Sequence, residues 1–411
     1  MAKISNNIIF VNRFFYPDLS ATSQILSDLA FDLAEQGYNI DVLASRMRYD
    51  MPDVELPATE TIRGVKVCRV VTTRFGRGSL VGRACDYLSF YISCFFTLLI
   101  HVKKGTIVVA KTDPPLVSVI AALVVTLKGG ILVNWLQDLF PEVADRLDIK
   151  VAKGAIGKIL QRVRNWSLRK AAMNVVLGTR MQDYVHNEGI SLKNISIVPN
   201  WSDIYLDPEQ EPEPNPYRKQ WELEDKFVVG YSGNMGWAHD FDTLIGAADR
   251  LQHREDIVFL FIGGGAKREY IETRVRELSL RNVVFKDYQP REALLDSLRV
   301  PDVHMITLLP ELEGFIVPSK FYGVAAVGRP TFFVGSKQGE LGELLGKHKA
   351  GHVVEIGEDQ QLAALIEKSS NDQDDVTQLG KNALRAYQDN YSRAKAAERW
   401  GGILQSASRQ S

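Results

Sequence analysis

The stretch Glu313-Gly314-Phe315-Ile316-Val317-Pro318-Ser319-Lys320 carries the most information about the fold and chemistry of this chain. It follows an apolar run, Val303–Ile306, and precedes a helical segment rich in alanine and glycine, Phe321–Gly328. This order predicts a strand, a loop at its carboxyl end, and a helix. Ligands of open α/β sheets bind outside the carboxyl ends of strands. A carboxylate and an ammonium in such a loop could hold a sugar hydroxyl and a phosphate, and a surface ion pair is the alternative interpretation.

Similar apolar runs alternate with helical patterns on both sides of this stretch. They are fully apolar, as expected for parallel strands that are covered on both faces. The runs lie at residues 8–11, 41–44, 106–110, 131–136, 174–177 and 195–198, and again at 227–231, 257–262, 283–285, 303–306, 331–334 and 352–355. We therefore predict an α/β protein with two doubly wound, Rossmann-like domains.

A segment rich in proline and acid, Asp207–Pro216, separates the two series and is typical of a linker. We predict a first domain over residues 1–205, a linker over 206–225 and a second domain over 226–390. The remaining residues, 391–411, form a helix that carries Trp400 and is expected to pack back on the first domain.

Composition is that of an ordinary folded protein, with 45% hydrophobic and 24% charged residues among 411. Cys68, Cys85 and Cys94 lie far apart without a Cys-x-x-Cys pair, which predicts neither a zinc site nor a disulfide framework and fits a reducing cytoplasm. We expect no signal peptide.

The charge is distributed unevenly between the two halves. Residues 1–205 contain 24 Lys/Arg against 18 Asp/Glu, and the rest contains 25 against 32. A basic first half suggests an anionic partner, but no nucleic-acid motif is present and we expect no nucleic acid.

Two glycine-rich turns follow strands of the second domain. In Tyr231–Gly236, the residues Gly233, Asn234 and Gly236 could let backbone amides approach a diphosphate near a helix N-terminus, predicted from about Asp240. A tight turn explains this pattern equally well. The second turn, Gly263–Gly265, fits close chain packing as well as it fits ligand contact.

Several motifs in this order resemble the retaining glycosyltransferases of the GT-B fold, in which two Rossmann-like domains face each other across a cleft. The likeness is greatest to the bacterial branch that builds extracellular, capsular and O-antigen polysaccharides, and it spans about residues 8–400. It rests on Asn234 with Gly236, Glu313–Pro318, Val317–Gly323, Ala326-x-Gly328-x-Pro330, Phe14–Asp18, Trp135–Glu142 and Val198–Trp201.

The resemblance implies a role for each matching residue. Glu313 lies in the donor-sugar pocket, and the backbone of Gly314 and Phe315 contacts sugar hydroxyls, with Ser319 in the same loop. Gly233, Asn234 and Gly236 approach the diphosphate, and the loop of Pro17 to Ser23, with Ser20, meets it from the first domain. Asp138 is a candidate on the acceptor side.

The chain departs from the family pattern in two ways. The family places a second glutamate, which holds the ribose, where this chain has Gly323, so Glu340 or Glu343 is a candidate substitute. The family's Arg and Lys after the first glycine turn appear as Asn234 and His239. Lys320 is therefore our candidate for neutralising the departing diphosphate, and His239 could share that task or act as a cap.

The resemblance implies that no metal is needed. The sequence contains Asp240-Phe-Asp242 and Asp372-Gln-Asp374, which match the Asp-x-Asp pattern that holds Mg²⁺ in unrelated glycosyltransferases. A helix start, where acids suit the dipole, explains the first pair, and a polar loop explains the second.

The first domain also carries signs of a membrane partner. Residues 150–170 contain seven Lys/Arg and no acid, with Ile156, Ile159, Leu160, Val163 and Trp166 at helical spacing. The uncharged run Tyr87–Ile100 is about 14 residues long, too short to span a bilayer. It fits a buried helix, partial insertion or an apolar acceptor channel.

Together these features predict transfer of a sugar from a UDP- or GDP-sugar to a polyprenyl-diphosphate-linked glycan, with retention. The enzyme would be cytoplasmic and peripheral on an anionic membrane face. A nucleotide-sugar epimerase of the same fold and a non-catalytic binding subunit are the alternatives.

Overall fold

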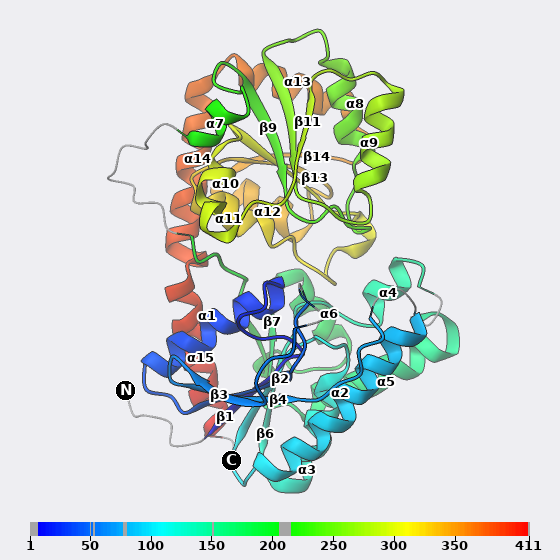
Figure 1. The fold of residues 1–411 in the computed structure, drawn as a ribbon, viewed down its shortest axis with the longest axis vertical. Coiled ribbons are helices and arrows are strands. Elements are labelled where there is room, and N and C mark those ends of the chain that lie inside the picture. Colours follow the sequence, from blue (N-terminus) through cyan, green and yellow to red (C-terminus); the bar gives the residue numbers. More distant parts are fainter. Residues whose placement is uncertain are drawn as a thin grey trace. The chain divides into compact units, whose positions relative to one another are not determined.

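The chain divides into two compact units, and the computed structural model describes residues 7–49, 51, 54–76, 80–149, 152–204 and 215–409. The first unit contains the residues up to Pro199 together with Arg393–Ser411, and the second contains Asn200–Ser392. Each unit has one sheet covered by helices (Figure 1). The predicted α/β class with two doubly wound, Rossmann-like units is confirmed.

The sheet of the first unit has eight strands. They are β1 Ile8–Val11, β2 Ile40–Ser45, β3 Thr59–Ile62, β4 Val65–Val70, β5 Ile107–Ala110, β6 Ile131–Trp135, β7 Met173–Val176 and β8 Ile195–Ile197. Their order is β3-β4-β2-β1-β5-β6-β7-β8, and every neighbouring pair is parallel except β3 with β4. The hairpin of β3 and β4 at the sheet edge was not predicted, because its strands are short and partly exposed rather than fully apolar.

Helices cover both faces of this sheet. They are α1 Ala21–Glu35, α2 Leu80–His101, α3 Val117–Lys128, α4 Glu142–Arg146, α5 Gly154–Lys170, α6 Thr179–Asn187 and α15 Arg393–Ser408, with a 3-10 turn at Leu192–Asn194. Residues of α2 and α3 share one core with β1, β5 and β6, and α5 packs against α3. Helices α1 and α15 pack against each other and contact the strands as well.

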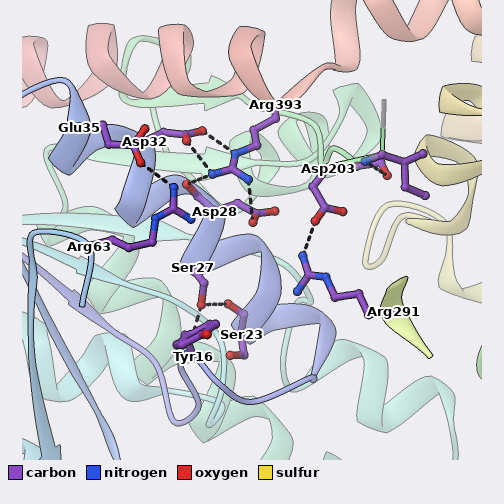
Figure 2. Close-up of polar contacts among 12 residues, drawn as sticks. Tyr16, Ser23, Ser27, Asp28, Asp32, Glu35, Arg63, Asp203, Arg291 and Arg393 are labelled. Carbon is purple, nitrogen blue, oxygen red and sulfur yellow. Dashed lines mark hydrogen bonds and ion pairs between the residues drawn. The ribbon is translucent and has the colours of Figure 1, made fainter. Parts of the chain in front are cut away.

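Helix α15 is fixed to the first unit at its start and in its middle. The Arg393 guanidinium donates to Oδ2 and Oδ1 of Asp32, at 2.7 and 2.6 Å, and to Oδ1 of Asp28 at 3.1 Å (Figure 2). Trp400 is fully buried, with its ring centroid 4.7 Å from that of Trp135 and 6.3 Å from that of Phe10. The last helix is therefore part of the core of the first unit.

The second unit has a six-stranded, fully parallel sheet. Its strands are β9 Phe227–Ser232, β10 Ile257–Ile262, β11 Val283–Lys286, β12 Val303–Thr307, β13 Thr331–Val334 and β14 Gly351–Val354, in the order β11-β10-β9-β12-β13-β14. Its helices are α7 Pro216–Gln220, α8 Asp242–Arg250, α9 Arg268–Glu277, α10 Leu294–Arg299, α11 Lys320–Ala326, α12 Glu340–His348, α13 Asp359–Ser370 and α14 Gln373–Ala386. Short turns lie at Arg291–Ala293, Pro310–Leu312 and Tyr387–Tyr391. Buried residues of α8, α9 and α13 form the larger core.

The predicted linker of residues 206–225 is only partly described, since residues 206–214 lie outside the described ranges. Its last part is folded rather than extended. Helix α7 begins after Asn215, whose side chain accepts from the amide of Tyr217 at 3.0 Å. Trp221 and Leu223 then pack into a core with Val228.

Helix α2 differs from its prediction in length and exposure. It runs over 22 residues, Leu80–His101, because the helix also includes the more polar residues 80–86 before the predicted run and His101 after it. In the described part of the chain it is the one helix long and apolar enough to cross a membrane. Only 22% of its apolar 18-residue stretch is buried. Of the three interpretations, a buried helix therefore fits the inner side of α2, where Phe90, Cys94 and Leu98 are buried, but not its outer face.

Candidate active site

The second unit has its topological switch point between β9 and β12, which are neighbours in the sheet order β10-β9-β12-β13. Chain connections leave these two strands toward opposite sides of the sheet, and ligands of such sheets bind at this point. The loop after β9 contains Gly233, Asn234, Gly236 and His239, and the loop after β12 leads to Glu313 and Lys320. The sequence-predicted residues of this unit therefore lie in the two loops of the switch point.

The two glycine turns pack directly on each other. The amide of Gly233 donates to the carbonyl of Ile262 at 2.8 Å, and that of Met235 donates to Gly264 at 2.7 Å. Gly263 has φ 121°, and a Cβ at this position would lie 2.4 Å from the Gly233 carbonyl oxygen. Close chain packing is therefore the role of Gly263–Gly265, and this turn holds the turn at Gly233 in place.

Lys320 joins the second loop to the first. Its Nζ donates to the Tyr231 hydroxyl at 2.9 Å and to the Asn234 carbonyl at 3.2 Å, and it lies 3.2 Å from Nε2 of His239. Nδ1 of His239 is 2.6 Å from the carbonyl oxygen of Thr307, so Nδ1 carries the proton and Nε2 accepts from Lys320. Among the predicted residues, Lys320, Asn234 and His239 are brought together in one cluster.

Burial sets the charge of this cluster. Desolvation lowers the pKa of Lys320 to about 7. Desolvation, with the nearby Lys320 charge as a second cause, lowers the pKa of His239 to about 3. His239 is therefore neutral at physiological pH, where it can accept from Lys320 but carries no charge for a phosphate. Lys320 is the member whose ammonium a bound anion would stabilise.

Glu313 contacts a different element from Lys320. Its Oε2 accepts from the amide of Glu340, the first residue of α12, at 3.2 Å, so the carboxylate lies at the N-terminus of this helix, where the dipole favours negative charge. A Cβ on Gly339 would come within 2.0 Å of Oε1 of Glu313. Because Gly339 has no side chain, the Glu313 carboxylate can occupy this space. Glu313 and Glu340 are therefore neighbours in space.

The remaining predicted residues of this unit lie in the loop after β12 and in α11. Gly314 has φ 81°, a left-handed conformation that favours glycine. Phe315 is buried at 8% exposure, and Ser319 is exposed directly before α11. Gly323, the position of the missing glutamate, lies in α11, where a Cβ would be 3.3 Å from Leu298.

Two functional candidates were missed by the sequence reasoning. Tyr231 is the residue before the last one of strand β9, and its hydroxyl accepts from Lys320 and donates to the Asn234 carbonyl at 2.9 Å. Lys267 follows the second glycine turn, and its Nζ donates to the carbonyl of His239 at 2.7 Å. A cation immediately after a strand–glycine turn is the signal that could have identified Lys267.

Pro17, Ser20 and Asp138 belong to the first unit, at the carboxyl ends of β1 and β6. Ser20 precedes the first residue of α1, and its amide donates to Oδ1 of Asp18 at 2.8 Å. Asp138 is exposed after β6.

A buried lysine also lies at this edge of the first sheet. Lys111 is 2% exposed, donates to the Thr22 carbonyl at 2.7 Å and lies 4.1 Å from the Trp135 ring centroid. Burial lowers its pKa to about 7, opposed by the charges of Asp113 and Asp138. Lys111 was not predicted, although it directly follows the run 106–110.

Two further features lie apart from these loops. Within the described residues, no group of three His, Cys, Asp or Glu side chains is placed to hold a metal ion. Asp240 instead accepts from the amide of Thr243 at 3.1 Å, and α8 begins at Asp242 rather than Asp240. A cavity of about 350 Å³ in the first unit lies between the end of α2 and strands β2 and β4, and no candidate residue lines it.

Comparison with known proteins agrees with this geometry. Residues 215–386 match the family model of the group 1 glycosyl transferases. The chain is 26% identical over 345 residues to the Escherichia coli K12 protein WcaI, named for colanic acid biosynthesis, covering 80% of this chain and 83% of that protein.

Two solved structures share the fold over almost the whole chain. One is a sucrose-phosphate synthase of Thermosynechococcus elongatus, with TM-score 0.77 and 16% identity over 99% of this chain and 100% of that one. The other is Anabaena HepE in complex with UDP, with TM-score 0.72 and 15% identity over 97% and 100%. Residues 215–386 thus form a group 1 glycosyl transferase domain, and the chain is a glycosyltransferase of the GT-B fold.

Proposed function

We propose that this glycosyltransferase moves a sugar from a nucleotide diphosphate sugar to a lipid-linked glycan in polysaccharide biosynthesis. The observation that carries the proposal is the cluster of Lys320, Tyr231, Asn234 and His239 at the switch point of the second sheet. The cluster places a lysine, the first residue of α11, beside a glycine turn, which is an arrangement suited to a diphosphate.

Known proteins of this fold support the donor class. The HepE structures contain UDP, and one contains UDP with glucose. The name of WcaI, which refers to colanic acid, supports a polysaccharide as the product. A UDP-sugar is therefore the first donor to test, with a GDP-sugar as the second.

In the proposed reaction the bond between the anomeric carbon and the donor phosphate breaks, and a bond from that carbon to an acceptor oxygen forms on the same face. The acceptor proton passes to the leaving phosphate oxygen. Lys320 stabilises the negative charge that develops on the diphosphate. The role proposed for Glu313 is to bind the donor sugar, and Glu340 is the proposed ribose contact. No metal takes part in these steps.

The acceptor side is proposed to lie on the first unit, with Asp138 near the acceptor and the Pro17–Ser20 loop near the donor phosphates. A polyprenyl-diphosphate-linked glycan fits the excess of positive charge in the first half of the sequence. The enzyme would then act at the cytoplasmic face of a membrane.

The donor is tested by thermal unfolding with UDP-, GDP- and dTDP-sugars, because a ligand that binds the folded state stabilises it more as its concentration rises above its Kd. Transfer is then measured with a lipid-linked acceptor in wild type, in Glu313→Gln and in the matched control Glu311→Gln, which changes an exposed carboxylate two residues away. We expect Glu313→Gln to lose transfer while the control keeps it.

Product analysis separates the proposal from its alternatives. Interconversion of free nucleotide sugars without an acceptor would instead identify an epimerase. If a partner protein catalyses transfer equally well with Glu313→Gln and with wild type, this chain would instead be a binding subunit. Inversion at the anomeric carbon would contradict the proposed stereochemistry, and loss of transfer on adding a chelator would contradict the metal-free reaction.

A further inference from the structure

Three helices of the first unit form one continuous layer on one face of its sheet. Helix α3 packs against both α2 and α5. The inner side of α2 belongs to the core, where Phe90, Cys94 and Leu98 are buried against strands of the sheet. The outer sides of the three helices are therefore the parts that could meet a partner.

The outer side of α2 is apolar from Leu88 to Ile100. Residues at every fourth position point outward, with exposures of 58% for Leu88, 51% for Ile92, 60% for Phe96 and 75% for Ile100. A step of four residues keeps side chains on one face of a helix. This row therefore forms a continuous apolar ridge rather than scattered exposed residues.

The two neighbouring helices extend the ridge into a face. Leu123 and Leu127 of α3 are 41% and 68% exposed, and Ile156 and Ile159 of α5 are 57% and 55% exposed. Of the 22 exposed large hydrophobic residues in the described part of the chain, ten lie on these three helices. Exposed apolar residues gathered in this way mark an interaction surface.

The charge around this face has one sign. The sequences of the three helices contain a single acid, Asp86, which is 1% exposed and accepts from the amides of Phe75 and Gly76 at 3.0 Å. Exposed cations instead lie on the three helices or shortly after them. They are Lys103 and Lys104 after α2, Lys128 at the end of α3, and Lys158, Arg162, Arg169 and Lys170 on α5.

An apolar face with a cationic rim fits an anionic lipid surface, in which acyl chains take up the apolar side chains and headgroups pair with Lys and Arg. A second copy of this chain is a poorer partner, because pairing this face with itself would bring like charges together. We propose that the outer face of α2, α3 and α5 docks on an anionic bilayer, with α2 lying in the plane of the interface.

The packing of α2 decides between lying in the interface and crossing the membrane. A helix of 22 residues is about 33 Å long, which is enough to cross the hydrocarbon core. Crossing would remove Phe90, Cys94 and Leu98 from the core of the unit and would separate Asp86 from the loop that it holds. The in-plane arrangement keeps these contacts and buries only the exposed ridge.

The test is co-sedimentation of the full chain with lipid vesicles. Wild type should bind vesicles of phosphatidylcholine with phosphatidylglycerol more strongly than vesicles of phosphatidylcholine alone. The double variant Leu88→Gln, Phe96→Gln should lower the partition coefficient at least about tenfold, because both side chains would insert. The matched control Leu192→Gln, Tyr270→Gln changes exposed residues on other elements and should leave binding unchanged.

A second variant tests the charged rim independently of the ridge. The triple change Lys128→Glu, Lys158→Glu, Arg162→Glu should remove the preference for anionic vesicles while weak binding to neutral vesicles remains. Washing bound wild type with carbonate at pH 11 should release it, as expected for a helix in the interface, whereas a crossing helix would stay in the membrane.

Three results would overturn the proposal. The first is equal binding of the α2 variant and wild type, and the second is retention of wild type after the carbonate wash. The third is a fall in solution mass from dimer to monomer in the α2 variant, which would identify a second copy as the partner. The proposal names the membrane surface for the proposed lipid-linked acceptor, but vesicle binding is measured without sugars. A failure here is therefore distinguishable from a failure of the transfer reaction.

Discussion

The protonation of Lys320 offers a quantitative test of the candidate donor site. Burial lowers its pKa to about 7, so at pH 8 only about one tenth of the free protein carries the ammonium. A bound diphosphate would place negative charge beside this group and return its pKa toward the ordinary value of about 10.4. Binding at pH 8 should therefore take up about 0.9 proton per molecule.

Isothermal titration calorimetry in phosphate and in Tris buffer measures this uptake, because the two buffers differ in ionisation enthalpy. The ligand is the nucleoside diphosphate that gives the largest thermal shift. Its affinity should also fall about tenfold per pH unit between pH 8 and 9, since each binding event must first protonate the lysine.

Two variants isolate the lysine. Lys320→Arg keeps the positive charge but does not titrate in this range, so nucleotide binding should persist with almost no proton uptake. Lys320→Met keeps the length without the charge, and it should lose both the uptake and about 100- to 1000-fold in kcat, as for removal of one preorganised donor. Wild type that binds the nucleotide at pH 8 without taking up a proton would refute the reasoning, as would unchanged uptake in Lys320→Met.

Three further variants test other parts of the structure. Gly339→Ala should reduce transfer as strongly as Glu313→Gln, because the added methyl group displaces the Glu313 carboxylate. The melting temperature of this variant should change little. Normal activity would contradict the proposed role of that carboxylate. His304 is buried, and this burial lowers its pKa to about 4. As the pH falls below about 6.5, the histidine is therefore protonated in the unfolded chain before it is protonated in the folded one. In urea unfolding, wild type should lose about 2 kcal/mol more stability than His304→Gln between pH 7.5 and 5. Equal losses would show that His304 does not couple folding to pH. Trp400→Ala removes a fully buried ring and should lower the free energy of unfolding of the first unit by about 3–5 kcal/mol; a loss below 1 kcal/mol would mean that α15 is not part of that core.

The sequence predicted the strands of both sheets well because most of them are covered on both faces. A strand such as β10, Ile257–Ile262, is buried at every position and so appears as an unbroken apolar run. The β3–β4 hairpin escaped this criterion because alternate side chains face solvent at the sheet edge. The length of α2 was underestimated because polar residues at its start interrupt the apolar run.

The candidate site was predicted only in part. Family motifs pointed to Glu313 and Lys320, but not to their surroundings. The Tyr231 hydroxyl contacts Lys320, which lies 89 residues further along the chain. Gly339 approaches Glu313, which lies 26 residues before it in the sequence. No local pattern records such contacts, because they arise only when the sheet brings the strand ends together. The charge state of His239 likewise follows from burial, which its neighbours in sequence do not reveal.

The return of α15 to the first unit separates the order of synthesis from the order of folding. The strands of the first sheet leave the ribosome first, yet the place of Trp400 beside Phe10 and Trp135 stays empty until the whole second unit has been made. The second unit is continuous in sequence and can fold as soon as it emerges. A chain terminated before Arg393 would therefore contain a complete second unit and an unfinished first one, with apolar surface exposed to chaperones and proteases.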